Sequence, residues 1–291
     1  MIESANQEQR EYWNGSDSQE WIVEADRYDA MLAPYGETVL DAANLTRGEH
    51  VLDVGCGGGS TTLGAATRVG AGDGDGDGDG DGDAVGFDIS APMLEVARAR
   101  ASARGISNAR FMLGDAQTDA LGGAYDIAIS RFGIMFFADP VAAFANLRSA
   151  LAPGGRVALL CWRPMLDNEW IIVPTAAALE HVPPPEPPPP NSPGPFRFGE
   201  EGSLGAALAA AGFVDVTSDA VDGPMLVGGP GSFDDAYDFL KGSGMTRRVI
   251  GDASAEAKTQ ARAAMRDALL PFATDDGVRM NGAMWLVRGR V

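Results

Sequence analysis

The chain has very little cysteine, histidine or lysine, with two of each among its 291 residues. The cysteines, Cys56 and Cys161, form no Cys-x-x-Cys pair, so neither a disulfide framework nor a structural zinc site is expected. His50 precedes an apolar run and His181 lies beside prolines, which favours a surface position for both. No metal site is therefore predicted, and no residue is assigned as a general base.

Positive charge and long apolar runs are also scarce. The chain has 22 Lys and Arg against 41 Asp and Glu, a net charge of −19, and such an acidic surface disfavours nucleic acid as a partner. No run of about 18 uninterrupted apolar residues is present, so no membrane span is predicted. The polar first ten residues lack the apolar segment of a signal peptide. We expect a soluble, acidic, cytoplasmic protein and assign no oligomeric state.

Short apolar runs alternate with helical stretches from about residue 50 onward. This alternation is typical of βαβ units and predicts an α/β fold with a mostly parallel sheet. Helices are expected over 92–104, 140–151, 204–211 and 253–270. The expected strands are 51–54, 84–88, 110–113, 125–130, 156–162, 213–216 and 283–287.

The regions that interrupt this alternation suggest the domain organisation. Residues 1–47 are expected to form an N-terminal helical cap, and 48–291 a single domain with insertions. A proline-rich insertion covers 163–200, where the run of prolines favours an extended chain. Residues 231–272 are predicted to form two or three helices that act as a lid.

The run 72–83 alternates glycine and aspartate. Like charges two residues apart repel and glycine adds backbone entropy, so a solvated flexible loop is the favoured interpretation. A calcium site is the alternative, but neither EF-hand spacing nor a closing glutamate is present.

A glycine-rich loop follows the first strand in the string Val51-Leu52-Asp53-Val54-Gly55-Cys56-Gly57-Gly58-Gly59-Ser60. Glycine lets the backbone turn sharply and approach a ligand closely, and the helix that follows offers free N–H groups. A tight structural turn or a dinucleotide site could also explain this loop. The dinucleotide fingerprint, however, requires a third glycine where this chain has Ser60.

An acidic residue, Asp88, ends the second strand in the string Gly86-Phe87-Asp88-Ile89-Ser90. A carboxylate in this position can accept hydrogen bonds from the two ribose hydroxyls of a nucleotide. A helix-capping role is the alternative, although Ser90 is the better N-cap because Pro92 follows in the first turn.

Four ordered motifs together resemble the class I S-adenosylmethionine (SAM)-dependent methyltransferases. They are the glycine loop, the Asp88 strand end, Gly114-Asp115-Ala116, and the turn Leu151-Ala152-Pro153-Gly154-Gly155-Arg156. The whole chain resembles the ubiquinone/menaquinone-biosynthesis-like branch of small-molecule methyltransferases, including Tyr12-Trp13-Asn14-Gly15 and Ser130-Arg131-Phe132-Gly133. The resemblance implies a Rossmann-like, seven-stranded sheet with helices on both faces, and SAM as the cofactor.

The resemblance also implies a role for each cofactor residue. The loop glycines would lie beneath the methionine part of SAM, and Asp53 would hold its ammonium. Asp88 would bind the ribose, and Asp115 would accept a hydrogen bond from the adenine amino group. The implied cofactor-binding residues are Asp53, Gly55, Cys56, Gly57, Gly59, Asp88, Ile89, Met93, Asp115, Ala116, Ser130, Arg131, Trp13 and Trp21.

Methyl transfer from a sulfonium is a direct displacement that needs positioning and exclusion of water more than acid–base catalysis. Arg131 is a candidate for orienting the acceptor, with a structural ion pair as the alternative. For Trp13 and Trp21, core packing is the alternative to covering the cofactor. Aromatic residues outside the motifs suggest a small apolar or aromatic acceptor: Phe136, Phe137, Trp162, Trp170, Phe196 and Phe198.

Two other functions remain open at this stage. The chain could bind SAM without catalysing a reaction, or it could be a nicotinamide-dependent oxidoreductase. The sequence leaves open which acceptor is methylated, and whether the methyl group goes to oxygen, nitrogen or carbon.

Overall fold

The computed structural model describes residues 6–70 and 82–291. The Gly/Asp run predicted as a loop at 72–83 therefore lies outside the described residues, except for Gly82 and Asp83. Neither the loop interpretation nor the calcium alternative is addressed by the structure.

The described chain follows the expected order of helices and strands, with an additional helix, Glu169–Leu179, inside the insertion predicted at 163–200. The α-helices are α1 (Gln7–Asn14), α2 (Gln19–Val23), α3 (Ala25–Ala43), α4 (Ser60–Val69), α5 (Ala91–Arg104), α6 (Pro140–Ala150), α7 (Glu169–Leu179), α8 (Ser203–Ala210), α9 (Phe233–Gly242), α10 (Gly244–Ile250) and α11 (Ala255–Leu269). Short 3-10 turns are η1 (Ser16–Ser18), η2 (Gly133–Phe136), η3 (Met165–Asp167) and η4 (Leu270–Phe272). The strands are β1 (His50–Val54), β2 (Asp83–Asp88), β3 (Ala109–Leu113), β4 (Tyr125–Arg131), β5 (Leu151–Trp162), β6 (Val214–Leu226), β7 (Ala273–Thr274) and β8 (Gly277–Arg290).

The central sheet has the strand order β3-β2-β1-β4-β5-β8-β6. Strands β1 to β5 are parallel, and β8 enters antiparallel between β5 and β6. Strand β7 pairs only with β8. The order reverses between β1 and β4, and ligands of open α/β sheets bind at such a reversal, beyond the carboxyl ends of the strands. The prediction of a seven-stranded, mostly parallel, Rossmann-like sheet is confirmed.

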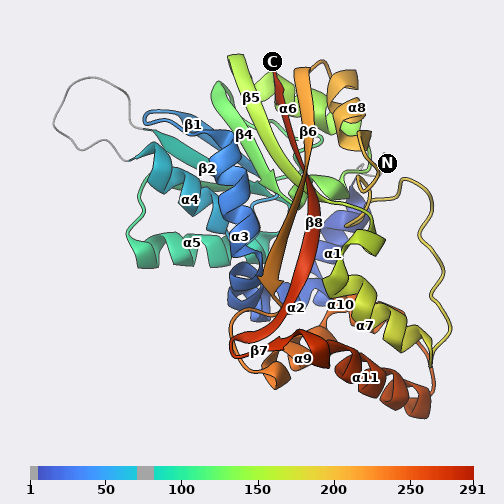
Figure 1. Cartoon of the computed structure of the whole chain (residues 1–291). Coiled ribbons are helices and arrows are strands. Elements are labelled where there is room, and N and C mark those ends of the chain that lie inside the picture. The colour runs from blue at the N-terminus through green and yellow to red at the C-terminus, as the bar shows by residue number, and fades with distance from the viewer. Residues whose placement is uncertain (1–5, 71–81) are drawn as a thin grey trace.

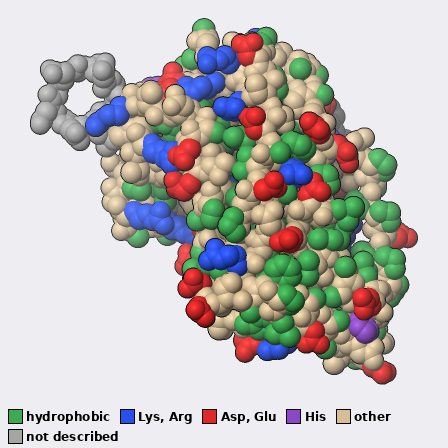
Figure 2. All heavy atoms as spheres, viewed as in Figure 1, with side chains coloured by type: hydrophobic (Ala, Val, Ile, Leu, Met, Phe, Trp, Pro, Cys, Tyr) green, Lys and Arg blue, Asp and Glu red, His purple; other side chains and the backbone are tan. Residues whose placement is uncertain are grey.

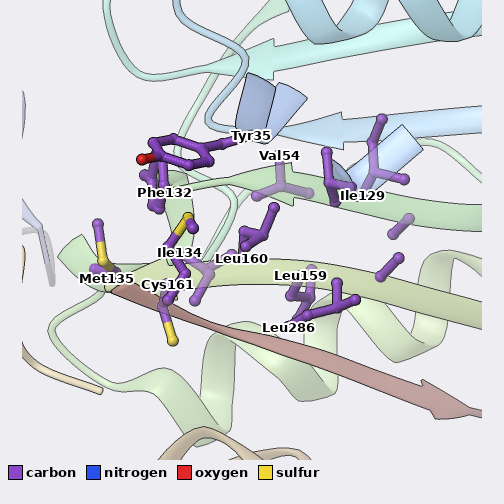
Figure 3. Close-up of a cluster of buried hydrophobic side chains, with 14 of the residues drawn as sticks. Tyr35, Val54, Ile129, Phe132, Ile134, Met135, Leu159, Leu160, Cys161 and Leu286 are labelled. Carbon is purple, nitrogen blue, oxygen red and sulfur yellow. The ribbon is translucent and has the colours of Figure 1, made fainter. Parts of the chain in front are cut away.

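Helices cover both faces of this sheet (Figure 1). Helices α3 and α4 pack together on one face, and α6 and α8 pack together on the other. The central residues of β1 and β4 are apolar and buried, as parallel strands covered on both faces require: Val51, Leu52, Ile127, Ala128 and Ile129. Side chains such as Val54, Ile129, Leu160 and Leu286, from four different strands, meet in the interior (Figure 3).

Side-chain caps fix where two helices begin at the edge of the sheet. Ser90 accepts a hydrogen bond from the Met93 N–H at the start of α5, and Pro92 follows in its first turn. Asp139 does the same for α6, where Pro140 is the first helical residue. Proline is well placed there because the first N–H groups of a helix lack intrahelical partners. The predicted N-cap role of Ser90 is confirmed.

Three strands are longer than the sequence pattern predicted. Strand β5 starts at Leu151 rather than Arg156, because Leu151 pairs with Tyr125 before residues 152–155 interrupt the register. Strands β6 and β8 extend well beyond 213–216 and 283–287 and pair along almost their whole length. The polar and glycine residues of β6 hid this extension, because they interrupt the apolar alternation that marks a strand.

The helices of the predicted lid lie at one end of the molecule, together with α7 (Figure 1). Helix α7 packs against α10 and α11, and together they bury a small second core of Ala178, Val182, Val249, Ile250, Ala261 and Met265. The predicted helices in 231–272 are confirmed as α9, α10 and α11. The proline-rich segment 183–195 contains neither helix nor strand, as expected, and links the lid to α8.

Charges of both signs are interspersed on the face shown in Figure 2. Many of the arginines pair with nearby acids, for example Arg288 with Asp219 and Arg68 with Glu37. Within residues 6–70 and 82–291, no helix is long and apolar enough to cross a membrane.

Candidate functional site

A cavity of about 800 Å³ opens at the carboxyl ends of β1, β2 and β4. The glycine loop and the ends of these strands form its floor. Residues of α1, α2 and α3 form one wall, and residues of α7, α9 and α10 form the opposite wall. Its volume lies toward the upper end of the range for small-molecule sites, so a nucleotide-sized ligand and a second molecule can share it.

The glycine loop between β1 and α4 packs closely against the backbone at one glycine and leaves open space at another, as its sequence predicted. Gly55 has φ +67°, and a Cβ added there would lie 2.6 Å from the Cα of Gly133. Gly57 has φ +51°, but a Cβ there would meet only the Met93 methyl group, at 3.5 Å. Gly55 is therefore required for backbone packing, whereas Gly57 leaves room for a ligand at the cavity floor.

Asp88 lies at the cavity wall, at the carboxyl end of β2. One carboxylate oxygen accepts a hydrogen bond from the Gly57 N–H (2.7 Å) and the other from the Ser90 N–H (2.8 Å). Burial raises its pKa, although these backbone hydrogen bonds act in the opposite direction. Each oxygen keeps a second lone pair, so the carboxylate can still accept hydrogen bonds from ligand hydroxyls.

Asp53 is completely buried directly before the loop. Its Oδ2 accepts a hydrogen bond from the Thr62 hydroxyl (2.7 Å), but its Oδ1 has no partner among the described residues. Burial raises the pKa of Asp53 to about 6, while Thr62 and the nearby Arg131 lower it. An unpartnered buried carboxylate oxygen is costly, so the site favours a cationic or hydrogen-donating ligand group. The ammonium of SAM fits that requirement.

Asp115 and Ala116 line the cavity beyond the end of β3. The Asn6 side-chain amide donates to both Asp115 oxygens, at 2.8 and 2.9 Å, and the Gln117 N–H donates to Oδ1. The side-chain oxygen of Asn6, Oδ1, accepts a hydrogen bond from the Ala138 N–H at 2.8 Å. These contacts fasten the start of α1 over the third motif.

Helix α1 is also fastened over the second motif. The Asn14 amide donates to the Ile89 carbonyl (3.0 Å) and accepts from the Ala91 N–H (3.0 Å). The Ser90 hydroxyl donates to the Trp13 carbonyl at 2.8 Å. Trp13 and Trp21 contact each other edge to face and both line the cavity, together with Ile89 and Met93. The two tryptophans therefore combine packing with a position facing the cavity.

Arg131 lines the cavity at the end of β4, but its guanidinium already has partners. It donates to Asp29 Oδ1 at 3.0 Å and to the Leu32 carbonyl at 3.4 Å. Asp29 also accepts from the Ser60 hydroxyl at 2.9 Å and pairs with Arg100. This cluster ties α3 to the glycine loop, which favours the ion-pair interpretation of Arg131.

Ser130 lies inside the protein rather than at the cavity. It is fully buried, donates to the Val54 carbonyl at 2.6 Å and accepts from the Gly133 N–H at 3.2 Å. The hydroxyl thus joins the ends of β1 and β4. Cys56 is also buried but lines the cavity, and burial raises the pKa of its thiol.

Aromatic side chains dominate the half of the cavity beyond these motifs. Trp162, from the end of β5, stacks on Phe132 with 4.1 Å between ring centroids and lies 5.2 Å from Trp170 of α7. Phe136 and Phe137 also line this half, as predicted for an apolar acceptor. Phe198 instead packs against Phe144 in the core, and Phe196 packs on its edge.

The remaining candidates lie away from this site. His50 bonds Asp83 at the opposite end of β1, and His181 follows α7 on the surface. Cys161 is buried in β5, where burial raises the pKa of its thiol. Within the described residues, neither histidine lines the cavity, and no cluster of three potential metal ligands occurs.

Sequence reasoning missed Asn6, Glu20 and Asp29, which link the N-terminal helices to the site. Polar residues on helices usually face solvent, so their pattern gave no signal. Asn14 lies inside the string Tyr12-Trp13-Asn14-Gly15, whose resemblance to the family was the signal in the sequence that α1 belongs to the site.

Comparison with known proteins agrees with this geometry. A family model described as "Methyltransferase domain" matches residues 45–173. The chain is similar to aklanonic acid methyltransferase DauC of Streptomyces sp. (strain C5), with 33% identity over 53% of this chain and 69% of that protein. It is equally similar (33%) to nocamycin O-methyltransferase of Saccharothrix syringae, over 65% of this chain and 69% of that protein. Demethylmenaquinone methyltransferase of Thermus thermophilus is 41% identical over 28% of this chain and 36% of that protein.

Solved structures share the fold at low sequence identity. The YcgJ protein of Bacillus subtilis superposes with a TM-score of 0.55 at 18% identity, over 88% of this chain and 97% of that one. The [4+2]-cyclase SpnF superposes with a TM-score of 0.50 at 20% identity, over 88% of this chain and 79% of that one. One fold therefore hosts proteins named for different reactions, and the reaction has to be argued from the site.

Proposed function

Since the chain belongs to the class I SAM-dependent methyltransferases, we propose that it transfers the methyl group of SAM to an oxygen atom of a small, apolar or aromatic acceptor. One observation carries this proposal. The cofactor motifs and an aromatic wall face the same cavity of about 800 Å³. A single space of this size can hold the methyl donor and its acceptor side by side.

We assign the cofactor half of the cavity to the residues around the glycine loop. Asp88 would hold the ribose, Asp115 and Ala116 the adenine, and Asp53 the ammonium. SAM, when bound, supplies an electrophilic methyl group on a sulfonium whose leaving group is neutral. The protein is then required to position the acceptor and exclude water, which the tryptophans of α1 and α2 and the lid are placed to do.

Two similarities support oxygen as the methylated atom and natural products as the acceptor class. The nocamycin enzyme is named as an O-methyltransferase, and the name of DauC gives an acid, aklanonic acid, as its substrate. The predicted ubiquinone/menaquinone-like branch is the second candidate, because its named relative matches a much smaller part of this chain. The nicotinamide alternative is set aside by the family to which the chain belongs.

We further propose that residues 1–47 act as a cap on a methyltransferase domain formed by 48–291. The contacts of Asn6, Asn14 and Asp29 with the sheet motifs support this division. A cytoplasmic location stays a prediction from the sequence.

The test is methyl transfer from trideuteromethyl-labelled SAM to a panel of fused aromatic phenols, carboxylates, amines and quinols. Mass spectrometry detects the transfer, and NMR of the product identifies the methylated atom. We expect oxygen methylation of at least one aromatic acceptor and none of the amines. Binding of S-adenosylhomocysteine without transfer to any panel member would favour a non-catalytic SAM-binding protein instead.

A further inference from the structure

Three arginines line the cavity, and two of them already have partners. Arg131 is paired with Asp29, and Arg247 with Glu20 of α2. Arg248 of α10 also lines the cavity. Its side chain makes no hydrogen bond, ion pair or ring contact with any residue within 6–70 and 82–291. The acceptor side of the site therefore contains one guanidinium whose binding capacity is unused.

The backbone that carries Arg248 is held in place on both sides. Glu20 Oε1 accepts a hydrogen bond from the Gly244 N–H at 2.8 Å, and the Ser243 hydroxyl accepts from the Thr246 N–H at 3.2 Å. After Arg248, Val249 and Ile250 are buried in the second core of the lid. A fixed backbone with a free side chain suits ligand binding, because only the side chain has to be ordered.

Four of the five acids that line the cavity have partners of their own. Asp88 and Asp115 accept hydrogen bonds from backbone and side-chain groups of the cofactor half. Asp29 and Glu20 are each paired with an arginine. Glu8 is exposed on α1, two residues after the Asn6 that bonds Asp115. Within residues 6–70 and 82–291 no acid pairs with Arg248, so a ligand can supply its counter-ion.

We propose that Arg248 determines acceptor specificity by binding a carboxylate on a fused aromatic acceptor. This inference rests on the proposed function, and it specifies in addition that the acceptor carries a negative charge. The planar guanidinium can bind both carboxylate oxygens, while Trp162 and Trp170 contact the rings. With a net charge of −19 the protein repels anions in general, so a bound anion requires a local cation such as Arg248.

Binding of matched probes tests the proposal in the presence of saturating S-adenosylhomocysteine. Anthraquinone-2-carboxylate and anthraquinone-2-carboxamide have the same rings and differ in charge, and quenching of tryptophan fluorescence reports their binding. We expect the wild-type protein to bind the carboxylate about 10-fold or more tightly than the amide. Arg248→Gln should remove that preference, and Arg248→Lys should keep part of it.

Arg104→Gln is the matched control, because it removes one exposed arginine from α5, away from the cavity. It should bind both probes like the wild type. Equal affinity of the wild type for the two probes, no binding of either, or a preference that persists in Arg248→Gln would each overturn the proposal. Calorimetry with S-adenosylhomocysteine separates this failure from that of the proposed function, which requires cofactor binding whatever the probes do.

Discussion

Asp53 combines complete burial, an unpartnered oxygen and a raised pKa of about 6. Because burial raises this pKa, the protonated acid prevails in the ligand-free protein below about pH 6. Its stabilising contribution is complete below about pH 4 and is lost as the pH rises through about 6. At neutral pH the buried carboxylate is charged, and it gains most from a cationic ligand group.

This charge state predicts a pH dependence of cofactor binding. A bound ammonium favours the charged carboxylate, so below about pH 6 binding must release a proton from Asp53. The affinity for S-adenosylhomocysteine, which carries the same ammonium, should be constant above pH 7 and about 10-fold lower at pH 5. Calorimetric titrations from pH 5 to 8 measure this directly.

Asp53→Asn provides the control for that measurement. It should weaken binding at pH 7.5 and flatten the pH dependence, leaving only the part due to Asp88, whose pKa burial also raises. A variant with the full wild-type pH dependence would show that another group is responsible.

At the scale of elements, the contact between α2 and α10 closes the cavity from opposite sides. Glu20 accepts from the Gly244 N–H and pairs with Arg247, while its own helix carries Trp21 into the cavity wall. The Glu20 side chain is 13% exposed and that of Arg247 is 49% exposed. Because the arginine is half in solvent, the pair contributes only about 1 kcal/mol.

Glu20→Gln should loosen α10 without unfolding the lid, whose core lies on the other side of that helix. Amide hydrogen exchange of residues 244–250 is expected to accelerate about fivefold, with α7 and α11 unchanged. Glu24→Gln is the matched control, because among the described residues the Glu24 carboxylate pairs with Arg27, three residues away on the surface. Unchanged exchange of 244–250 in Glu20→Gln would show that this contact does not hold the lid.

The sequence predicted the sheet motifs well because each one is a contiguous string at the end of a strand. Gly57, Asp88 and Asp115 line the cavity, whereas Asp53 is fully buried beside the lining residue Val54. Asp29 could not be predicted in the same way. It lies on a helix whose polar residues resemble a solvated face, and only the packing of α3 against the loop gives it partners.

The acceptor half was predicted less completely for a similar reason. Aromatic residues indicate burial but not which space they fill, so Trp162 and Trp170 line the cavity whereas Phe198 fills the core. The extent of β6 and β8 was underestimated because glycine and polar or charged residues interrupt their apolar pattern. Tertiary pairing, rather than local preference, decides such segments.

At the scale of the whole molecule, the proposed site has two halves. The cofactor half lies on the sheet, and the acceptor half lies on the segments inserted around it. The cofactor half is built from strand ends that the hydrophobic core holds in place (Figure 3). The acceptor half comes from α7, α9 and α10, which pack around a small core of their own.

One calorimetric titration tests whether SAM binds in this cavity through Asp88. S-adenosylhomocysteine should bind the wild-type protein at a ratio of one to one. Asp88→Asn keeps one acceptor oxygen but loses the charge, and it should weaken binding about 10- to 100-fold. Asp219→Asn, on the surface of β6, should bind like the wild type. Failure of the wild type to bind, or undiminished binding by Asp88→Asn, would contradict the account.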